Sequence, residues 1–313
     1  MTPARRVLVT GASGFVGRRA LAPLLARGME VHAVGRASSA PAGTPHGVVW
    51  HRADLLDAGA GAAVVAAAGA SHLLHLAWFA EPGAFWDARA NAPWVAATIA
   101  LVDAFATAGG ARAVLAGTCA EYDWSAPQPL REASPLAPAT YYGACKDATR
   151  RVAEGLAERA GIAFAWGRIF FLYGPREDER RLVASVARRL VAGERAPTSA
   201  GTQLRDFLHV DDVAGAFAAL VDSDVTGAVN VGSGEPVAVS WIVERLAAAA
   251  GRPDLLDVGA LPQRAGDPEE IAADVARLRD EVGFTPARTL AEGLEQTMDW
   301  WRAVQPDPPV RRP

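Results

Sequence analysis

The sequence contains little cysteine and no marked excess of charge of either sign. Two cysteines, Cys119 and Cys145, in 313 residues cannot form a disulfide framework, and their spacing is not that of paired metal ligands. We therefore expect a reducing, cytoplasmic location and no bound metal. The 31 basic and 35 acidic residues give a formal net charge of −4, which argues against electrostatic binding of nucleic acid.

Long apolar runs are also missing. The N-terminus lacks the apolar stretch of an export signal, and the alanine-rich residues 58–70 are interrupted by glycines and too short to span a bilayer. We expect no association with a membrane. Hydrophobic residues nevertheless make up 50% of the chain and charged residues 21%, so a folded core is expected.

Short apolar runs alternate with amphipathic stretches in the first half of the chain. Strands are predicted at 5–11, 29–35, 72–78, 111–118 and 161–170, and helices at 16–27, 58–68, 91–108 and 143–159. Strands that alternate with helices predict an α/β fold with a doubly wound parallel sheet.

The second half is less regular. Helices are predicted at 179–191, 213–221 and 290–304, and a strand at 227–233. We predict a nucleotide-binding domain formed by residues 1–170 with a contribution from about 203–232. Residues 171–202 and 233–313 would form a smaller, interleaved C-terminal lobe that binds substrate.

A glycine-rich loop follows the first predicted strand and precedes a helix. Gly11 permits a tight turn, Gly14 allows close approach of a pyrophosphate, and Gly17 allows the helix to pack on the sheet. The phosphates would lie at the helix N-terminus. This context predicts a dinucleotide site formed by Gly11, Ser13, Gly14, Phe15, Val16 and Gly17.

The end of the second strand indicates which dinucleotide binds. NAD sites usually place an acidic residue there for the ribose hydroxyls, whereas NADP sites add an arginine for the 2′-phosphate. Here Gly35 and Arg36 occupy that position, which favours NADP(H). NAD(H) remains an alternative if Arg36 is a solvated arginine that stacks on the adenine.

Tyr142 and Lys146 are four residues apart, one helical turn, and therefore project from the same helix face. An ammonium group near a phenol favours the phenolate, so Lys146 is expected to lower the pKa of Tyr142. Such a tyrosine can transfer a proton near neutral pH. The pair is a candidate for acid–base catalysis.

These motifs together resemble the extended short-chain dehydrogenase/reductase superfamily, in particular its nucleotide-sugar epimerase/dehydratase branch. The resemblance covers nearly the whole chain and implies a Rossmann-type fold. Its further elements are Asp54-Leu55, HLAW (75–78), Asn91, AGTCAEYD (116–123), YGACK (142–146), RIFFLYGP (168–175), RDFLHVDDV (205–213), NVGSG (230–234), RAGD (264–267) and GFTP (283–286).

The resemblance also implies roles for individual residues. Thr118 would donate a hydrogen bond to the substrate oxygen, Tyr142 would be the acid/base, and Lys146 would bind the nicotinamide ribose. Asp54 and Leu55 would flank the adenine, and Leu76 and Ala77 would line the phosphate–ribose region. The nucleotide diphosphate of the substrate would be held by Arg205 and Arg264, although each could instead form a structural ion pair, with Asp206 or Asp267.

Departures from the family pattern narrow the chemistry. Dehydratases carry Asp-Glu after the catalytic threonine, where this chain has Cys119-Ala120, so dehydration is not expected. Cys119 is predicted to be a buried, inert thiol. Phe171 replaces an asparagine that commonly contacts the diphosphate. A sugar pocket could be lined by Glu121, Trp78, Phe79, Trp86 and Trp124.

The sequence therefore predicts an NADPH-dependent 4-ketoreductase of a nucleotide-linked 4-keto-6-deoxyhexose, as used in deoxysugar biosynthesis. An NAD-dependent nucleotide-sugar 4-epimerase is the alternative, because Thr118, Tyr142 and Lys146 serve both reactions. A reductase of another carbonyl compound and a non-catalytic dinucleotide sensor are less favoured. The resemblance implies a homodimer formed through the helix before Thr118 and the helix that carries Tyr142.

Overall fold

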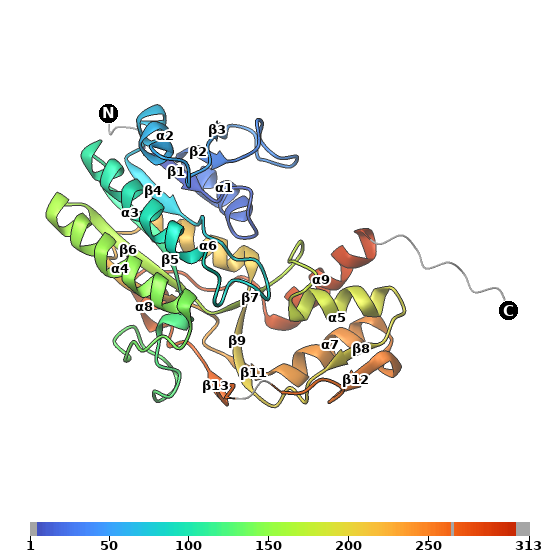
Figure 1. The fold of residues 1–313 in the computed structure, drawn as a ribbon. Coiled ribbons are helices and arrows are strands. Elements are labelled where there is room, and N and C mark those ends of the chain that lie inside the picture. The colour runs from blue at the N-terminus through green and yellow to red at the C-terminus, as the bar shows by residue number, and fades with distance from the viewer. Residues whose placement is uncertain (1–4, 264–265, 305–313) are drawn as a thin grey trace.

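The larger sheet has seven parallel strands in the order β10-β6-β5-β4-β1-β2-β3, which confirms the predicted doubly wound, Rossmann-type fold (Figure 1). The computed structural model describes residues 5–263 and 266–304. The strands are β1 (Arg6–Thr10), β2 (Glu30–Gly35), β3 (Val49–Arg52), β4 (His72–His75), β5 (Arg112–Thr118), β6 (Ala163–Ile169) and β10 (Gly227–Val231).

Helices cover both faces of this sheet. One face carries α1 (Gly17–Ala26) and α6 (Val210–Asp222), and the other carries α2 (Ala60–Ala68), α3 (Asn91–Thr107) and α4 (Tyr141–Ala160). Alternate side chains of β1 enter the two cores: Val7 and Val9 pack toward α1, whereas Leu8 packs toward α2 and α3. Burial on both faces explains why the predicted strands are almost entirely apolar.

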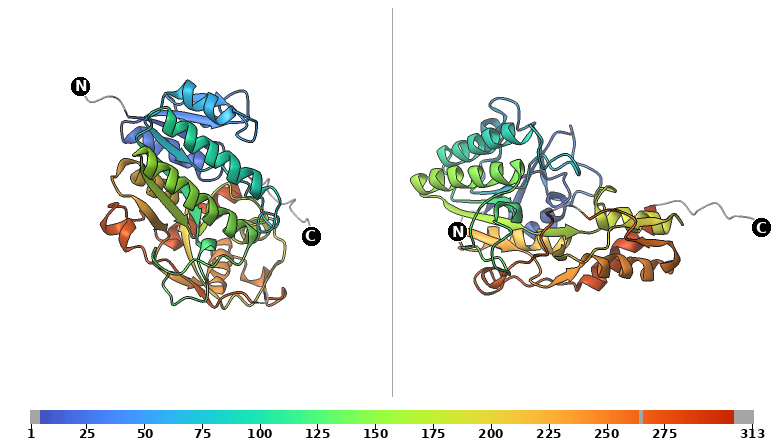
Figure 2. Two further views of the ribbon diagram at one scale, coloured as in Figure 1. Left: turned by 60° about the vertical axis from the view of Figure 1, so that its left-hand side comes forward. Right: turned by 60° about the horizontal axis from the view of Figure 1, so that its bottom comes forward.

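The smaller lobe is built around β9 (Leu204–His209) and lies beside the large sheet in both views of Figure 2. β9 pairs with β7 (Phe171–Tyr173), β11 (Pro236–Ala238) and β13 (Glu270–Ile271), and β8 (Ala196–Thr198) pairs with β12 (Leu256–Val258). An apolar core joins α5 (Leu182–Val191), α7 (Val239–Ala250) and α9 (Leu290–Val304). The shorter helices are η1 (Cys119–Glu121), η2 (Pro253–Leu255) and α8 (Ala276–Asp280).

The chain passes several times between the large sheet and the small lobe. Within the segment 203–232, β9 pairs in the small sheet, whereas α6 and β10 join the large one. The fully buried carboxylate of Asp206 accepts hydrogen bonds from the backbone N–H groups of Ser233 (2.6 Å), Gly234 (2.9 Å) and Ala273 (3.1 Å). One side chain thus ties together three separate segments of the chain.

Helix ends differ from the prediction where side chains bond to the backbone. The helix predicted from residue 179 begins at Leu182, because Asp178 Oδ1 accepts a hydrogen bond from the Arg180 N–H (3.0 Å) and forms a local turn. α6 begins at Val210, earlier than predicted, because His209 Nδ1 accepts from the Asp211 N–H (3.2 Å). Within the described residues, no helix combines the length and apolar character needed to cross a lipid bilayer.

Candidate active site

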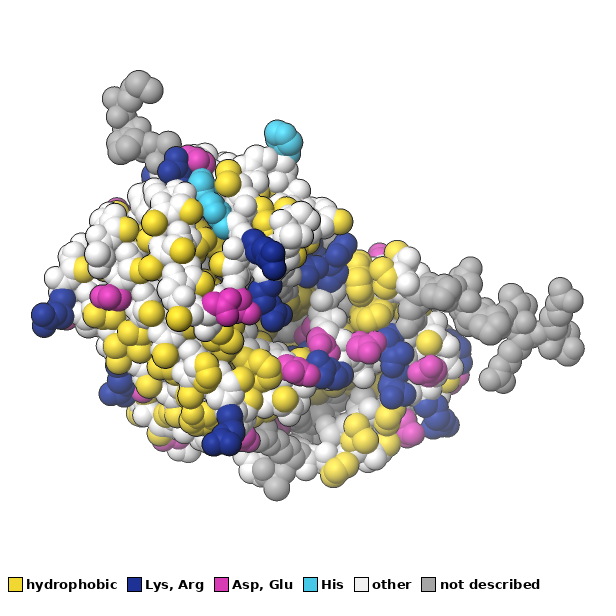
Figure 3. Space-filling view, turned by 45° about the horizontal axis from the view of Figure 1, so that its top comes forward, with side chains coloured by type: hydrophobic (Ala, Val, Ile, Leu, Met, Phe, Trp, Pro, Cys, Tyr) yellow, Lys and Arg dark blue, Asp and Glu magenta, His cyan; other side chains and the backbone are white. Residues whose placement is uncertain are grey.

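The predicted cofactor-binding loops and Thr118 lie at the carboxyl ends of the parallel strands, where open α/β sheets bind their ligands. The glycine loop follows β1, Arg36 follows β2, Asp54 follows β3, Leu76 follows β4 and Thr118 ends β5. The space-filling view shows a hollow between the large sheet and the small lobe, with basic and acidic side chains along its rim (Figure 3).

Backbone packing explains the glycine loop. Gly11 has a φ of 67°, and a Cβ there would lie 2.8 Å from the Ala77 nitrogen. A Cβ on Gly17 would lie 2.1 Å from the Gly11 carbonyl oxygen, so the loop and α1 can approach each other only with glycine at this position. The loop is closed by a hydrogen bond from the Gly14 N–H to the Gly11 carbonyl (2.8 Å).

The loop residues fit a dinucleotide pyrophosphate. Ser13 and Gly14 are exposed, and in the described structure no side chain caps the N-terminus of α1. Free N–H groups at a helix N-terminus attract phosphate. Arg18 donates hydrogen bonds to the carbonyls of Ser13 (2.7 Å) and Gly14 (3.1 Å). Leu76 and Ala77 adjoin the loop, where Ala77 N–H reaches Thr10 Oγ1 (3.4 Å).

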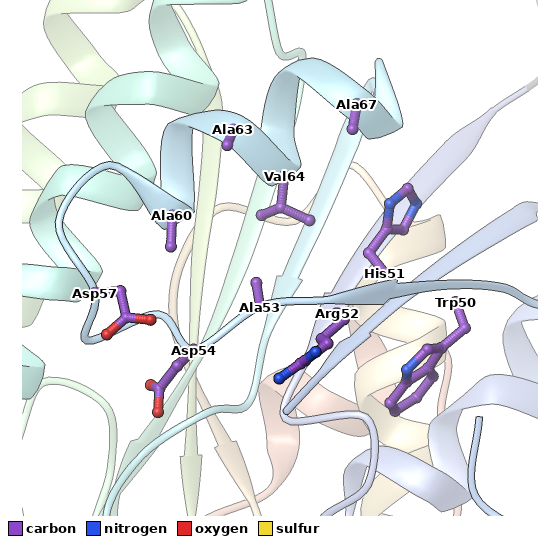
Figure 4. Close-up of a pocket in the computed structure, with 10 residues that line it drawn as sticks. All are labelled: Trp50, His51, Arg52, Ala53, Asp54, Asp57, Ala60, Ala63, Val64 and Ala67. Carbon is purple, nitrogen blue, oxygen red and sulfur yellow. The ribbon is translucent and has the colours of Figure 1, made fainter. Parts of the chain in front are cut away.

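Two arginines lie at the ends of β2 and β3. Arg36 is exposed directly after Gly35, and Gly35 is the register partner of the exposed Arg52. Trp50 packs over Gly35, where a Cβ would come within 2.4 Å of the indole. Arg52 and Asp54 line an open depression of about 540 Å³ between β3 and α2 (Figure 4). Next to Asp54, Leu55 is buried.

Thr118 ends β5, and Tyr142 and Lys146 lie on α4, which packs against β5; strands β4, β1 and β2 separate this group from β3. Thr140 caps α4 by accepting a hydrogen bond from the Gly143 N–H (3.1 Å), so Tyr142 lies in the first turn and Lys146 one turn later. Thr118 lies close enough to the Tyr142 phenol for its hydroxyl to favour the phenolate and lower the pKa of Tyr142. Lys146, which is the only lysine in the sequence, is buried and donates to the Ala116 carbonyl (2.9 Å).

The pKa of Tyr142 differs from the expectation. Burial raises the pKa of Tyr142, against smaller lowering effects of Thr118 and Arg181. The expected net lowering of the Tyr142 pKa is therefore wrong for this structure, because burial outweighs the charge of Lys146, whose Nζ lies 6.0 Å from the Tyr142 ring centroid and 3.9 Å from that of Trp78. Burial lowers the pKa of Lys146 to about 7, while the charge of Glu121 raises it.

Aromatic side chains surround the Tyr142 phenol. Phe85 meets its ring edge-on at 4.9 Å, and Trp86 does so at 6.0 Å. Trp124 lies 6.4 Å from Trp86 and donates from Nε1 to the Cys119 carbonyl (2.8 Å). We call Phe85, Trp86 and Trp124 the aromatic wall. Because this wall is apolar, it favours an apolar part of a substrate next to the phenol.

Glu121 does not face a substrate pocket. Its side chain is fully buried, and its oxygens accept hydrogen bonds from the Thr118 N–H (2.8 Å), from Trp166 Nε1 (2.9 Å) and from Arg168 Nε (2.8 Å). The expected direct contact of Glu121 with a sugar is therefore wrong. Its neighbour Cys119 is also buried, and burial raises the pKa of this thiol to about 12, which matches the inert thiol expected.

The small lobe brings Arg205 and Phe171 together. The Arg205 guanidinium carbon lies 5.6 Å from the Phe171 ring centroid, and Nη2 lies 2.8 Å from Asp267 Oδ1 without a hydrogen bond directed at it. The alternative of an ion pair is thus present, and the guanidinium retains a donor. Nearby in sequence, Thr198 Oγ1 and Gln203 Oε1 are buried without a partner among residues 5–263 and 266–304. Arg264 lies outside the described residues.

Sequence reasoning missed two arginines near the site. Arg52 is brought beside Arg36 only by the parallel pairing of β2 and β3. Arg181 lies with its guanidinium 5.1 Å from the Phe85 ring centroid, and its charge lowers the pKa of Tyr142. Neither residue belongs to a local motif. For Arg181 the available signal is the excess of arginine in 176–189, and no local signal singles out Arg52.

Comparisons with known proteins point to one family. The model of the NAD dependent epimerase/dehydratase family matches residues 7–232. A UDP-glucose 4-epimerase of Corynebacterium glutamicum is 29% identical, over 91% of this chain and 92% of the relative. The dTDP-6-deoxy-L-talose 4-dehydrogenase (NAD(P)(+)) of Kitasatospora kifunensis is 31% identical, over 94% and 95%. The solved UDP-glucose 4-epimerase of Thermus thermophilus with NAD has a TM-score of 0.83 at 28% identity, over 96% and 100%.

Proposed function

Because the chain belongs to the NAD dependent epimerase/dehydratase family, we propose that it reduces the 4-keto group of a nucleotide-linked 6-deoxyhexose with NADPH. The observation that carries this proposal is the position of Arg36, where an acidic residue would otherwise bind the ribose of NAD. Arg52, on the neighbouring strand, adds a second positive charge for a 2′-phosphate. A reductase with net turnover draws on the NADPH pool, whereas an enzyme that returns its hydride needs only resident NAD.

In this mechanism the bound cofactor supplies a hydride to C4 of the sugar. The Thr118 hydroxyl donates a hydrogen bond to the C4 oxygen, where negative charge develops. Tyr142 donates its proton to the same oxygen, and its raised pKa keeps the phenol protonated until that moment. Lys146 holds the cofactor ribose through its ammonium group.

Two further observations support the sugar and the diphosphate. The aromatic wall offers an apolar surface beside the Tyr142 phenol, which suits the methyl group of a 6-deoxyhexose better than a hydroxymethyl group. Arg205 can bind a diphosphate through two parallel hydrogen bonds. The relative from Kitasatospora kifunensis is a dTDP-6-deoxy-L-talose 4-dehydrogenase (NAD(P)(+)). The oxidation that this name describes is the reverse of the reduction that we propose.

A 4-epimerase is the second candidate. The relatives from Corynebacterium glutamicum and Thermus thermophilus are UDP-glucose 4-epimerases, and the latter was solved with NAD. Thr118, Tyr142 and Lys146 could oxidise C4 and reduce it again from the other face. Such an enzyme would retain NAD tightly and would consume no cofactor.

The test follows the fate of the hydride. Purified protein is incubated with dTDP-6-deoxy-L-talose and NADP⁺, and separately with UDP-glucose and NAD⁺. We expect NADP⁺ reduction equal to the ketone formed in the first mixture. The 4-epimer formed in the second mixture without net cofactor change would contradict the reductase and support the epimerase.

Cofactor choice is tested by Arg36→Ala. Loss of a charge-assisted contact should weaken NADPH binding about 10-fold or more and leave NADH binding nearly unchanged. Arg159→Ala is the matched control, because Arg159 is exposed at the far end of α4. Equal weakening of both cofactors, measured by calorimetry, would assign Arg36 no role in choosing NADPH.

We also propose a homodimer through α3 and α4. The α4 surface exposes Tyr141 (43%) and Val152 (46%), large apolar side chains that an interface would cover. Light scattering gives the mass in solution. Val152→Arg should convert a dimer into a monomer, while a mass equal to one chain before the substitution would exclude this interface.

A further inference from the structure

Behind Thr118 lies a buried charged group that the proposed mechanism does not use. Glu121 is completely buried, three residues after Thr118, and Arg168 on β6 is only 1% exposed. Their side chains form an ion pair, with Arg168 Nε 2.8 Å from Glu121 Oε2. Burying a charged side chain costs free energy unless the charge is paired and hydrogen-bonded, so the presence of this buried pair requires an explanation.

Glu121 fixes both the backbone and the hydroxyl of Thr118. The carboxylate accepts a hydrogen bond from the Thr118 N–H (2.8 Å), and Thr118 Oγ1 accepts one from the Ala120 N–H (3.2 Å), so that the two residues form a capping box around η1. Because Oγ1 already accepts from the backbone, its proton is free to point to the cleft, toward Tyr142. By holding the Thr118 N–H, the carboxylate fixes the turn whose Ala120 N–H orients the Thr118 hydroxyl.

Glu121 is itself held by side chains of the neighbouring strand β6. Trp166 Nε1 donates to both carboxylate oxygens (2.9 and 3.1 Å), and Arg168 Nη1 donates to the Tyr122 hydroxyl (2.9 Å) and to the Glu132 carbonyl (3.1 Å). Gly117 makes this approach possible, because a Cβ there would lie 2.0 Å from Trp166 Nε1. The carboxylate can therefore occupy a single position.

Stability alone does not account for the pair. Replacing a buried ion pair by apolar side chains of similar volume is often neutral or stabilising. An apolar pair would fill the same space between β5 and β6, but it could not accept the Thr118 N–H. What the carboxylate adds is a fixed acceptor and a fixed negative charge.

We propose that Glu121, held by Arg168 and Trp166, is a positioning residue that directs the Thr118 hydroxyl at the substrate oxygen. This role rests on the functions proposed for Thr118, Tyr142 and Lys146. It replaces the direct sugar contact expected from the sequence. Glu121 touches neither substrate nor cofactor and acts through Thr118 and through its charge.

The electrostatics of Lys146 agree with this role. Lys146 faces the Ala116 carbonyl, the Trp78 ring, Tyr142 and His75, and burial together with Lys146 lowers the pKa of His75 to about 3, so that this imidazole is neutral. Glu121 is the charged group that raises the pKa of Lys146 against the effect of burial. Without that charge, less of Lys146 would be protonated at neutral pH.

The first test is Glu121→Gln, which keeps the shape but removes the charge and one of the two acceptor oxygens. We expect kcat for dTDP-6-deoxy-L-talose oxidation to fall about 10²-fold, comparable to loss of one preorganised donor, with KM changed less than about threefold. Because Lys146 is the only lysine, ¹³C-lysine labelling gives one side-chain signal, and its titration midpoint should move to lower pH. An unchanged kcat and an unchanged midpoint would overturn the proposal.

A double variant separates positioning from stability. Glu121→Leu combined with Arg168→Met removes the pair without leaving one buried charge, so any fall in thermal stability should come only from the Thr118 and Trp166 N–H groups that lose their acceptor. Positioning predicts that kcat stays low in this variant. Recovery of kcat together with stability would show that the pair only fills space, and would refute the proposal even if Glu121→Gln does not fold.

Thr118→Val distinguishes failure of this inference from failure of the proposed function. If Thr118→Val abolishes turnover while Glu121→Gln does not, Thr118 keeps its role and Glu121 loses its own. If Thr118→Val has no effect, the proposed mechanism itself is wrong. The lysine titration needs no substrate, so it tests the charge of Glu121 even if dTDP-6-deoxy-L-talose is not turned over.

Discussion

The predicted catalytic group of the large sheet and part of the small lobe differ in how completely their polar side chains are satisfied. On the side of the large sheet, Thr118, Glu121 and Lys146 all have hydrogen-bond partners within the protein. On the side of the small lobe, buried polar atoms of Thr198 and Gln203 have no partner in the described part of the chain. Leaving a buried polar atom without a partner costs roughly 1–3 kcal/mol.

This difference indicates a division of labour. A catalytic group must be oriented before the substrate arrives, so its supporting hydrogen bonds are made within the protein. A group that recognises part of the substrate can leave its own bond to be completed by that ligand. Substitutions on the two sides should therefore act differently: those near the large sheet on turnover, and those in the small lobe on affinity.

The largest effect is expected for Tyr142→Phe. Removing the proton donor should reduce turnover about 10³-fold, within the usual range for general acid catalysis, without weakening cofactor binding. Steady-state kinetics and calorimetry measure the two quantities. Tyr141→Phe is the matched control, because that neighbour is exposed and should keep full activity. Near-normal turnover by Tyr142→Phe would contradict the role of Tyr142 as proton donor, and with it the catalytic role of the large-sheet side.

Arg205→Ala should act on affinity instead. Loss of a charge-assisted contact to diphosphate is expected to weaken dTDP binding about 10- to 100-fold and to change kcat little. Calorimetry with dTDP measures the change. The control is Arg195→Ala, an exposed arginine of the same lobe that pairs with Asp257. Undiminished dTDP binding would restrict Arg205 to its ion pair with Asp267.

Lys146 should make the stability of the free protein depend on pH. Its pKa is about 7 when folded and 10.5 when exposed, so between these values the unfolded chain binds more protons than the folded one. The free energy of unfolding should therefore rise with pH across this window, by up to about 1.4 kcal/mol per pH unit. Below pH 7 the destabilisation caused by burying the charged Lys146 is fully present. Denaturant unfolding of Lys146→Met should lack this contribution. Identical pH slopes in both proteins would place the Lys146 ammonium in solvent.

Thr198→Val should have the smallest effect. The Thr198 hydroxyl has no partner among the described residues, so its removal should change the free energy of unfolding by less than about 0.5 kcal/mol, or raise it. Affinity for dTDP should fall a few-fold if the hydroxyl meets the ligand. Clear destabilisation, measured in urea, would mean that the hydroxyl is already satisfied in the free protein.

The sequence was sufficient where function depends on neighbours along the chain. The glycine loop occupies one turn and Tyr142–Lys146 one helical turn, so spacing alone predicts their geometry. It was insufficient where contacts join distant segments. Glu121 meets Arg168 across 47 positions, and only the pairing of β5 with β6 reveals that its carboxylate faces inward. The prediction of a lowered pKa for Tyr142 is wrong for the same reason, because burial by distant segments outweighs the effect of Lys146.

Asp206 has a consequence for engineering. Its carboxylate joins β9 to the segments that hold Ser233 and Ala273, and β9 continues directly into α6 of the large sheet. The small lobe is therefore not a contiguous cassette. A chimera that exchanges this lobe for that of a relative must graft residues from both sides of α6 and β10, and it must transplant the acceptor at position 206 together with its three donors.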